Sequence, residues 1–438
     1  MRGRAMVLAR FQQWYTQLRS SMWLLPACFL VGASLLAFII TAIPGELPDA
    51  EQHWWAYLLA VNPEGASAVL TTIAGSMITV AGVTFSITML VLAQAASQYS
   101  PRLLRDYMAD RTNQLTLAVI VGVFAYCLLV LRSLPAGSLL LGHGIAVMVA
   151  LLGAFVGLAL LIYFIHHIAS SIQVSQVVAK ITEDTQAAIA QRYDQAFGRV
   201  AENPAALRAE AVTVSSNDDG SGHKPSGHTL AAPLTGFVQQ VYLNGLVKEA
   251  DAQGQVVTMR VAVGEFVVQG QPLLYLHGPG WDEERCAALL RCYVINRHRT
   301  IEQDPAFGIR QLVDIAIKAL SPGINDSTTA EQCVLYLGAV IADLSGRHMP
   351  EPFRRVNGQL RLQCQQRDFA DYVEAAFAQI ARDARGNLAV LATLGSSLAM
   401  LERTVPAERL GPIQQQRRHW AMQVRDSLSR EDQLTLKI

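Results

Sequence analysis

Small polar side chains recur along the apolar stretch from Ala66 to Ala96 at steps of four and three, with one skipped place near Leu90. That spacing puts them on one face of a helix. The stripe residues that we single out are Thr72, Ser76, Thr79, Gly82, Ser86 and Gln94. Two interpretations are open. Small and hydroxylated residues let membrane helices pack closely, whereas hydroxyl and amide oxygens around a pore can replace part of an ion's hydration shell.

A second set of candidate residues lies on and around a helix expected from Ile309 to Leu320. This helix is apolar on most sides and should be buried, and its one polar stripe carries Arg310 and Asp314 as an i,i+4 pair. The residues that we single out as a possible ligand or interface site are Asp304, Arg310, Asp314, Asn325 and Asp326.

The turn with Asn325 and Asp326 leads into another helix, for which Thr328 and Glu331 have the spacing of a capping box. One interpretation is a well-capped turn between core helices. The other is that the unpaired N–H groups at the helix start bind an anion or carboxylate, or that Asn325 and Asp326 orient a partner.

Other kinds of chemistry leave no pattern in the sequence. No Ser/His/Asp set, paired-carboxylate motif, H-E-x-x-H or phosphate-binding glycine loop is recognisable, so we expect neither enzymatic activity nor a cofactor. The six cysteines form no C-x-x-C pair, which argues against a zinc site or a disulfide framework. Thirty-five basic residues balance thirty-five acidic ones without a basic patch, so nucleic acid is not an expected partner.

The composition indicates a membrane protein, with 51% hydrophobic and only 16% charged residues. Four uncharged apolar runs approach the length needed to cross the hydrocarbon core: Met22–Ile43, Ala66–Ala96, Gln114–Leu131 and His143–His167. No Asp, Glu or Lys lies inside a run, whereas proton-coupled transporters usually need intramembrane ionisable groups. A passive pore remains compatible with these spans.

Arginines predict the orientation of the spans. Four precede the first run and three lie between the second and third, whereas residues 44–65 contain none. Because basic residues favour the cytoplasmic side, both termini should be cytoplasmic. His166 and His167, at the end of the fourth run, either anchor it at the interface or sense pH.

The predicted fold is an α-helical transmembrane domain of four spans followed by a cytoplasmic α+β region. Its parts are a cytoplasmic N-terminus (1–21), a four-helix transmembrane domain (22–167), a helical neck (168–205), a linker (206–229), a small antiparallel β domain (230–280) and a helical domain (281–438). Within the β domain, "VGEFVVQGQPLLYL" resembles the hairpin of biotinyl and lipoyl carrier modules, which predicts a barrel-sandwich-like fold. The lone lysine of this region, Lys248, lies outside the matching pattern, so cofactor carriage is not expected.

Several stretches, taken in order, resemble a family of predicted bacterial inner-membrane proteins known as domain of unknown function 2254. The stretches that carry the resemblance include "GVTFSITMLVLAQAASQYSPRLLRDYMAD", "FAYCLLVLR", "IYFIHHI", "QDPAFGIRQLVDIA" and "ALSPGIND". Ser327 stands where we expect a proline. The resemblance implies a multi-pass protein of the bacterial inner membrane with a cytoplasmic domain, and it implies no particular reaction or ligand.

Two functions follow from these observations. The first is an oligomeric passive channel, in which copies of the second span surround the path and the soluble domains form a cytoplasmic vestibule. The alternative is a membrane-anchored scaffold or sensor whose cytoplasmic domain binds a partner or a small ligand. The expected partners are membrane lipid, further copies of the chain, and an ion or small ligand.

Overall fold

The computed structural model describes residues 23–44, 62–98, 110–135, 141–171, 173–193, 227–349 and 351–436. The chain divides into two compact units, Met1–Gln173 and Val174–Ile438. The expected N-terminal segment 1–21, most of the loop 44–65, and Arg102 and Arg105 between the second and third spans lie outside the described residues.

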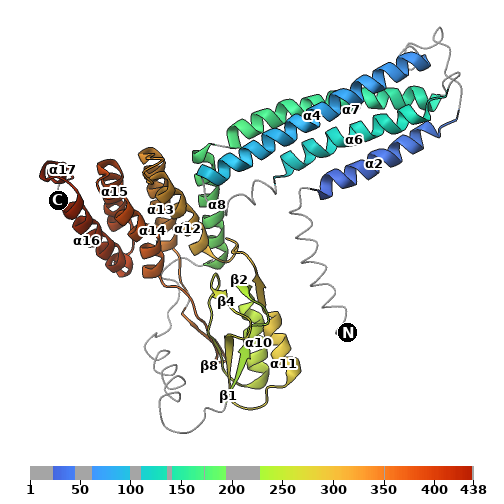
Figure 1. The fold of residues 1–438 in the computed structure, drawn as a ribbon. Coiled ribbons are helices and arrows are strands. Elements are labelled where there is room, and N and C mark those ends of the chain that lie inside the picture. Colours follow the sequence, from blue (N-terminus) through green and yellow to red (C-terminus); the bar gives the residue numbers. More distant parts are fainter. Residues whose placement is uncertain are drawn as a thin grey trace. The chain divides into compact units, whose positions relative to one another are not determined.

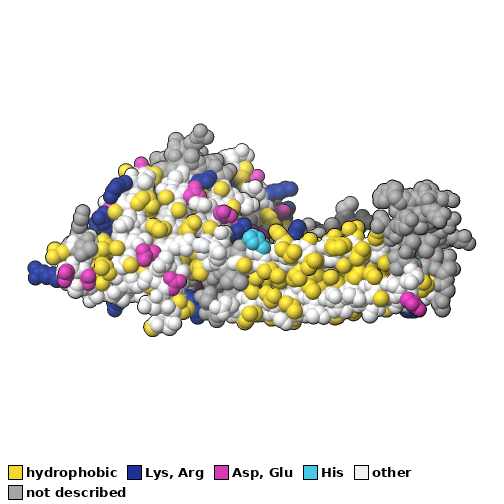
Figure 2. All heavy atoms as spheres, turned by 90° about the horizontal axis from the view of Figure 1, so that it is seen from above, with side chains coloured by type: hydrophobic (Ala, Val, Ile, Leu, Met, Phe, Trp, Pro, Cys, Tyr) yellow, Lys and Arg dark blue, Asp and Glu magenta, His cyan; other side chains and the backbone are white. Residues whose placement is uncertain are grey.

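Four long apolar helices form the described part of the first unit (Figure 1): α2 (Leu24–Thr41), α4 (Pro63–Gln98), α6 (Arg111–Ser133) and α7 (Leu141–Ser171). Each is long and apolar enough to cross a membrane, which confirms the four predicted spans as candidates. Figure 2 shows this unit as a broad hydrophobic surface with few charged side chains. Such a surface is stable when lipid covers it.

Helix α6 is the centre of the first unit, because it packs against α2, α4 and α7. Its Ile120 and Cys127 are fully buried. Tyr126 donates a hydrogen bond of 3.1 Å from its hydroxyl to the carbonyl of Ala146 on α7. Further along α7, a Cβ at Gly153 would lie 3.0 Å from the Val123 side chain, so glycine permits the close approach of the two helices.

The second unit contains α8 (Val174–Arg192) and a larger helical region. That region comprises α12 (Pro305–Ala319), α13 (Ser327–Ser345), α14 (Phe369–Asp383), α15 (Leu388–Thr404), η1 (Ala407–Arg409), α16 (Leu410–Ser427) and α17 (Arg430–Thr435). Helix α8 packs against α12 and α13. Leu312 and Val313 of α12 are fully buried, as its apolar sequence predicts.

Capping residues set the starts of the later helices. The Asp368 carboxylate accepts a hydrogen bond from the Asp371 amide, and the Asp371 carboxylate accepts one from the Asp368 amide, so the pair forms a capping box for α14. Asn387 accepts from the Val390 amide at the start of α15. Helices α14, α15 and α16 lie within the region 281–438, which the sequence predicts to be helical.

Two small sheets complete the second unit. The five-stranded sheet has the order β1-β5-β3-β8-β7, and the three-stranded sheet has the order β4-β2-β6. The strands are β1 (Gly227–Ala231), β2 (Gly236–Val241), β3 (Val257–Met259), β4 (Phe266–Val267), β5 (Pro272–His277), β6 (Tyr293–Asn296), β7 (Phe353–Val356) and β8 (Gln359–Gln363), with α10 (Leu243–Gln253) and α11 (Glu283–Arg291) among them. Val238, Leu246, Val257, Leu274 and Leu289 are fully buried in their shared core.

The sheets differ from the antiparallel β domain predicted over 230–280. Strands β6, β7 and β8 come from the region expected to be helical, and α10 interrupts the region expected to be all strand. Strand β3 pairs with β8 in parallel, with Val257 opposite Leu362. The two strands are about a hundred residues apart, so no local alternation could reveal their pairing. The segment likened to a carrier hairpin is split, because β4 pairs with β2 whereas β5 pairs with β1 and β3.

The neck and linker also differ from prediction where they are described. The chain does not continue as one helix from 168, because α7 ends at Ser171 and α8 begins at Val174. The buried face of α8, which includes Ile181 and Ile189, packs within the chain. At the far end of the predicted linker, residues 227–229 form the start of β1, and residues 194–226 lie outside the described part.

Candidate functional site

The polar stripe of the second span lies on the exposed face of α4. Thr72, Ser76, Thr79, Gly82, Ser86 and Gln94 are all exposed. The opposite face of α4 is the one buried in the bundle, through residues such as Leu70, Ala74 and Met77. The stripe is therefore not buried against α2, α6 or α7 of the same chain. Its contact with another copy or with water stays a prediction.

Each hydroxyl of the stripe donates its hydrogen bond within α4 itself. Thr72, Ser76, Thr79 and Ser86 donate to the carbonyl four residues earlier at 2.7–2.9 Å. A hydroxyl that donates inward keeps oxygen lone pairs that can accept from the outer side. A Cβ added at Gly82 would meet no atom within 4 Å. The face is shallow and polar, which suits close helix contact as well as contact with water.

Polar residues that the sequence reasoning missed line the inside of the bundle. Thr84 and Thr88 of α4 are buried, as are Asn113 and Thr116 of α6. They were overlooked because they fall among apolar residues and follow no separate stripe. Since α4 packs against α6, these side chains give the bundle a polar interior near the start of α6.

At that end of the bundle, Asp110 joins α6 to α7. Its carboxylate accepts the Thr112 amide as the N-cap of α6, and its Oδ2 lies 2.6 Å from Nε2 of His167. The His167 ring also stacks on Tyr163 at 5.9 Å. His167 thus bridges two helices, a contact that the sequence did not indicate.

The residues predicted as a ligand or interface site have separate local contacts, and their role in binding stays a prediction. Arg310 and Asp314 make the predicted ion pair at 2.5 Å, and Arg310 also donates to Gln379 of α14 at 2.6 Å. Asp326 caps α13 by accepting from the Thr329 amide at 3.1 Å. The expected capping box of Thr328 and Glu331 is wrong, since Glu331 instead accepts from Thr393.

Asn325 and Asp304 occupy constrained positions. Asn325 has a left-handed backbone (φ 49°) in the turn after α12, a conformation that asparagine tolerates. Asp304 is 4% exposed and its Oδ2 accepts from Nε and Nη2 of Arg299 at 2.9 and 2.6 Å. Burial raises the pKa of Asp304, although Arg299 acts to lower it. Gly264 packs against this pair with no room for a Cβ, which requires glycine there.

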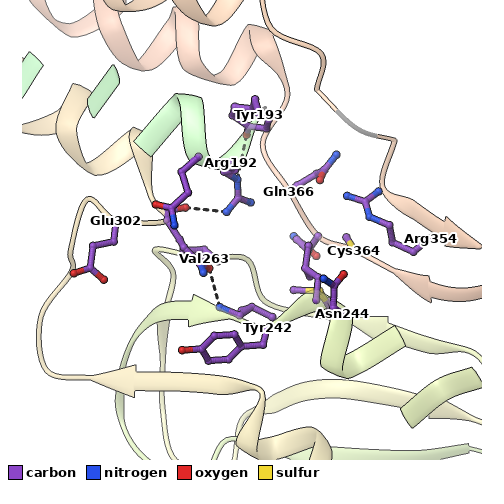
Figure 3. A pocket seen from close by; sticks show the side chains of 15 residues that line it. Arg192, Tyr193, Tyr242, Asn244, Val263, Glu302, Arg354, Cys364 and Gln366 are labelled. Atoms are coloured by element: carbon purple, nitrogen blue, oxygen red, sulfur yellow. Dashed lines mark hydrogen bonds between the residues drawn. The ribbon is translucent and has the colours of Figure 1, made fainter. Parts of the chain in front are cut away.

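A cavity of about 370 Å³ lies in the second unit, beside the Asp304 loop (Figure 3). The end of α8 contributes Arg192, and the start of α10 contributes Asn244. Strand β7 contributes Arg354, and Cys364 follows directly after β8. Gln303 fixes the ends of α8 and β2. Its carbonyl accepts from Nη1 of Arg192 at 2.8 Å and its side-chain oxygen accepts from the Val241 amide at 3.0 Å.

The cavity brings together positive charge and a buried thiol. Figure 3 shows Arg192 and Arg354 on different sides of Cys364. Burial raises the pKa of the Cys364 thiol, while Arg354 and Arg192 act to lower it. Sequence reasoning missed these residues because they come from elements far apart in the chain. One local signal was present: Asn357 and Gly358, both with positive φ, mark the β7–β8 hairpin that presents Arg354.

Comparisons with known proteins agree with the membrane character of the chain. An uncharacterized protein of Mycobacterium bovis and one of Mycobacterium tuberculosis are each 32% identical to it over 418 residues, covering 91% of this chain and 75% of the relative. No solved structure gives a significant match. The model of the predicted membrane protein family DUF2254 matches residues 19–400. The chain therefore belongs to the DUF2254 family of predicted membrane proteins.

Proposed function

We propose that the protein is an oligomeric passive channel of the bacterial inner membrane, with both termini in the cytoplasm and α4 lining the path. The observation that carries the proposal is the polar stripe on the exposed face of a membrane-length helix. Lipid tails offer hydroxyls no hydrogen bond, so this face gains nothing from contact with lipid. A second copy or water satisfies it better.

The length of the stripe favours a path over a local packing contact. Thr72 and Gln94 are 22 residues apart, which corresponds to about 33 Å along a helix. The hydrocarbon core is about 30 Å thick. A helix-packing motif needs only a few small residues around one crossing point. With one gap near Leu90, the stripe extends over the whole thickness, which is the extent that a polar pathway requires.

The chemistry of the stripe fits passive movement of ions. Hydroxyl and amide oxygens coordinate cations weakly enough to let them leave again. Between the terminal turns of the four helices there is no Asp, Glu or Lys. Intramembrane ionisable groups are the usual means of coupling transport to protons. Passive conduction requires no catalytic step.

Conductance across planar bilayers tests the channel. The purified full chain should conduct under voltage or membrane tension, and Ser76→Leu and Thr79→Leu should each reduce the current severalfold by placing an apolar side chain in the path. Ser34→Leu on α2 is the control outside the stripe, since Ser34 is partly exposed and its hydroxyl likewise donates to the carbonyl four residues earlier. A silent wild type, or equal currents in Ser76→Leu, Ser34→Leu and wild type, contradicts the proposal.

A membrane-anchored sensor is the second candidate, and the cavity of the second unit is the observation that favours it. Its volume of about 370 Å³ falls in the range of small-molecule sites, which is about 300–1,000 Å³. A ligand held there would contact the end of α8, the helix that follows the fourth span in the sequence.

A further inference from the structure

The cavity holds two guanidinium groups with unused donors. Arg192 donates from Nη1 to the Gln303 carbonyl and from Nε to the Tyr193 hydroxyl. Arg354 donates from Nη1 to the carbonyl of Glu351. Among the residues that the structure describes, no protein group pairs with the Nη2 of either arginine. Both arginines are partly exposed and line the cavity, so a ligand in the cavity can reach these donors.

Within the described part of the chain, no carboxylate forms an ion pair with either arginine, although Asp304 acts on Arg192 over a longer distance. Asp304 is the buried carboxylate nearest in sequence to the cavity lining, and its Oδ2 already accepts both hydrogen bonds from Arg299. Glu302 is exposed at the cavity edge, where it accepts from Gln240 at 2.5 Å. Neither acid lies within ion-pair distance of Arg192 or Arg354. A partly buried, unpaired positive charge is costly, and an anion that enters the cavity would remove that cost.

The rest of the lining suits an organic group. Val263 and Met259 are buried and give apolar contact, whereas Asn244 and Gln366 contribute carboxamides that can donate and accept. A cavity of about 370 Å³ is much larger than a single oxyanion needs, since a water molecule takes about 30 Å³ of liquid. The volume is comparable to that of a sugar phosphate or mononucleotide.

We propose that this cavity binds a small organic phosphate, with the phosphate oxygens between Arg192 and Arg354 and the organic group against Met259, Val263 and the carboxamides. Arginine favours this ligand because its planar fork of N–H donors matches phosphate oxygens in pairs. The inference names the ligand class for the sensor proposed above, and it is independent of conduction. The ligand would join the end of α8 to the β7–β8 hairpin and so favour one arrangement of these segments.

Titration calorimetry of the full chain in detergent tests the site. The probes are glucose 6-phosphate and adenosine 5′-monophosphate, and glucose and adenosine are their counterparts without phosphate. At least one phosphate probe should bind, and its counterpart should bind at least about tenfold more weakly, a loss of about 1.4 kcal/mol. If neither phosphate probe binds at millimolar concentration, or if a counterpart binds equally well, the proposal is overturned.

Neighbouring arginines on β7 provide a matched pair of variants. Arg354→Gln should weaken binding of the phosphate probe about tenfold, because it removes a charged donor from the cavity. Arg355→Gln removes the same charge one residue away. Because Arg355 donates to the Gly358 carbonyl and does not line the cavity, this variant should bind the phosphate probe with an affinity within about twofold of wild type. Equal affinities in the two variants would overturn the assignment, provided that their thermal midpoints match. If the protein conducts but does not bind the phosphate probes, only the ligand proposal is contradicted. If it binds a phosphate probe but does not conduct, only the channel proposal is contradicted.

Discussion

Replacing Gly308 with alanine tests whether α8 is fixed against α12 as closely as the structure indicates. A Cβ at Gly308 would overlap with Oγ1 of Thr185 and would lie 2.9 Å from its Cβ. Thr185 is fully buried, and its hydroxyl is held by the Ile181 carbonyl at 2.6 Å. Rotating the side chain would break that bond and would leave its Cβ in place. The two helices must therefore separate to accept the methyl group.

The expected loss follows from two opposing terms. Overpacking a tight contact costs about 1–3 kcal/mol. Alanine regains about 0.8–1.0 kcal/mol over glycine inside a helix. The net destabilisation is therefore about 1 kcal/mol, and each kcal/mol lowers the thermal midpoint of a domain of this size by about 2–4 °C.

Gly411→Ala on α16 is the matched control, because a Cβ there would meet no atom within 4 Å. Differential scanning fluorimetry of the full chain in detergent should place the midpoint of Gly308→Ala below wild type, and that of Gly411→Ala at or above it. A Gly308→Ala midpoint equal to or above that of Gly411→Ala would refute the close packing of α8 on α12.

Two further predictions concern buried ionisable groups of the second unit. Arg299→Gln leaves the buried Asp304 carboxylate without its partner and should lower the free energy of unfolding by about 3–5 kcal/mol at neutral pH. The loss should be smaller in acid, where Asp304 is protonated. Arg297→Gln, at an exposed neighbouring position, is the control and should change the stability little. Denaturant unfolding of both variants measures this, and equal stabilities would contradict it. Burial first, and Asp326 second, raise the pKa of Cys333 from 9.0 to about 12. The unfolded chain therefore loses this proton first, so stability should fall above pH 9 by up to about 1.4 kcal/mol per pH unit. Cys333→Ala should lack that share of the slope when unfolding is measured from about pH 8 to about pH 10, and parallel pH curves for wild type and variant would be inconsistent with it.

The sequence predicts those features that depend on local patterns. The span at His143–His167 is determined by an uninterrupted apolar run, and helix α7 contains all of it. Asp368 and Asn387 are N-caps that end a loop and start a helix through their own side chains, so α14 and α15 were predictable to within a residue or two. In both cases the deciding interaction lies within a few residues of the chain.

Features that depend on distant pairing could not be predicted in this way. Strand β8 pairs with β3, which lies about a hundred residues earlier, and no local pattern in either segment indicates this pairing. The cavity has the same origin, because Arg192 and Arg354 meet only when α8 and β7 are brought together. The polar stripe is an intermediate case. Its helical face was predictable from spacing, whereas its exposure depends on which face of α4 the other helices cover.

A density map of the assembled protein in lipid nanodiscs tests the central claim most directly, because it shows both the number of copies and the direction that α4 faces. If α4 lines the path, several copies should surround a water-filled axis, with Ser76 and Thr79 of each copy toward that axis. A monomer, or an assembly in which Ser76 and Thr79 face lipid, would contradict it.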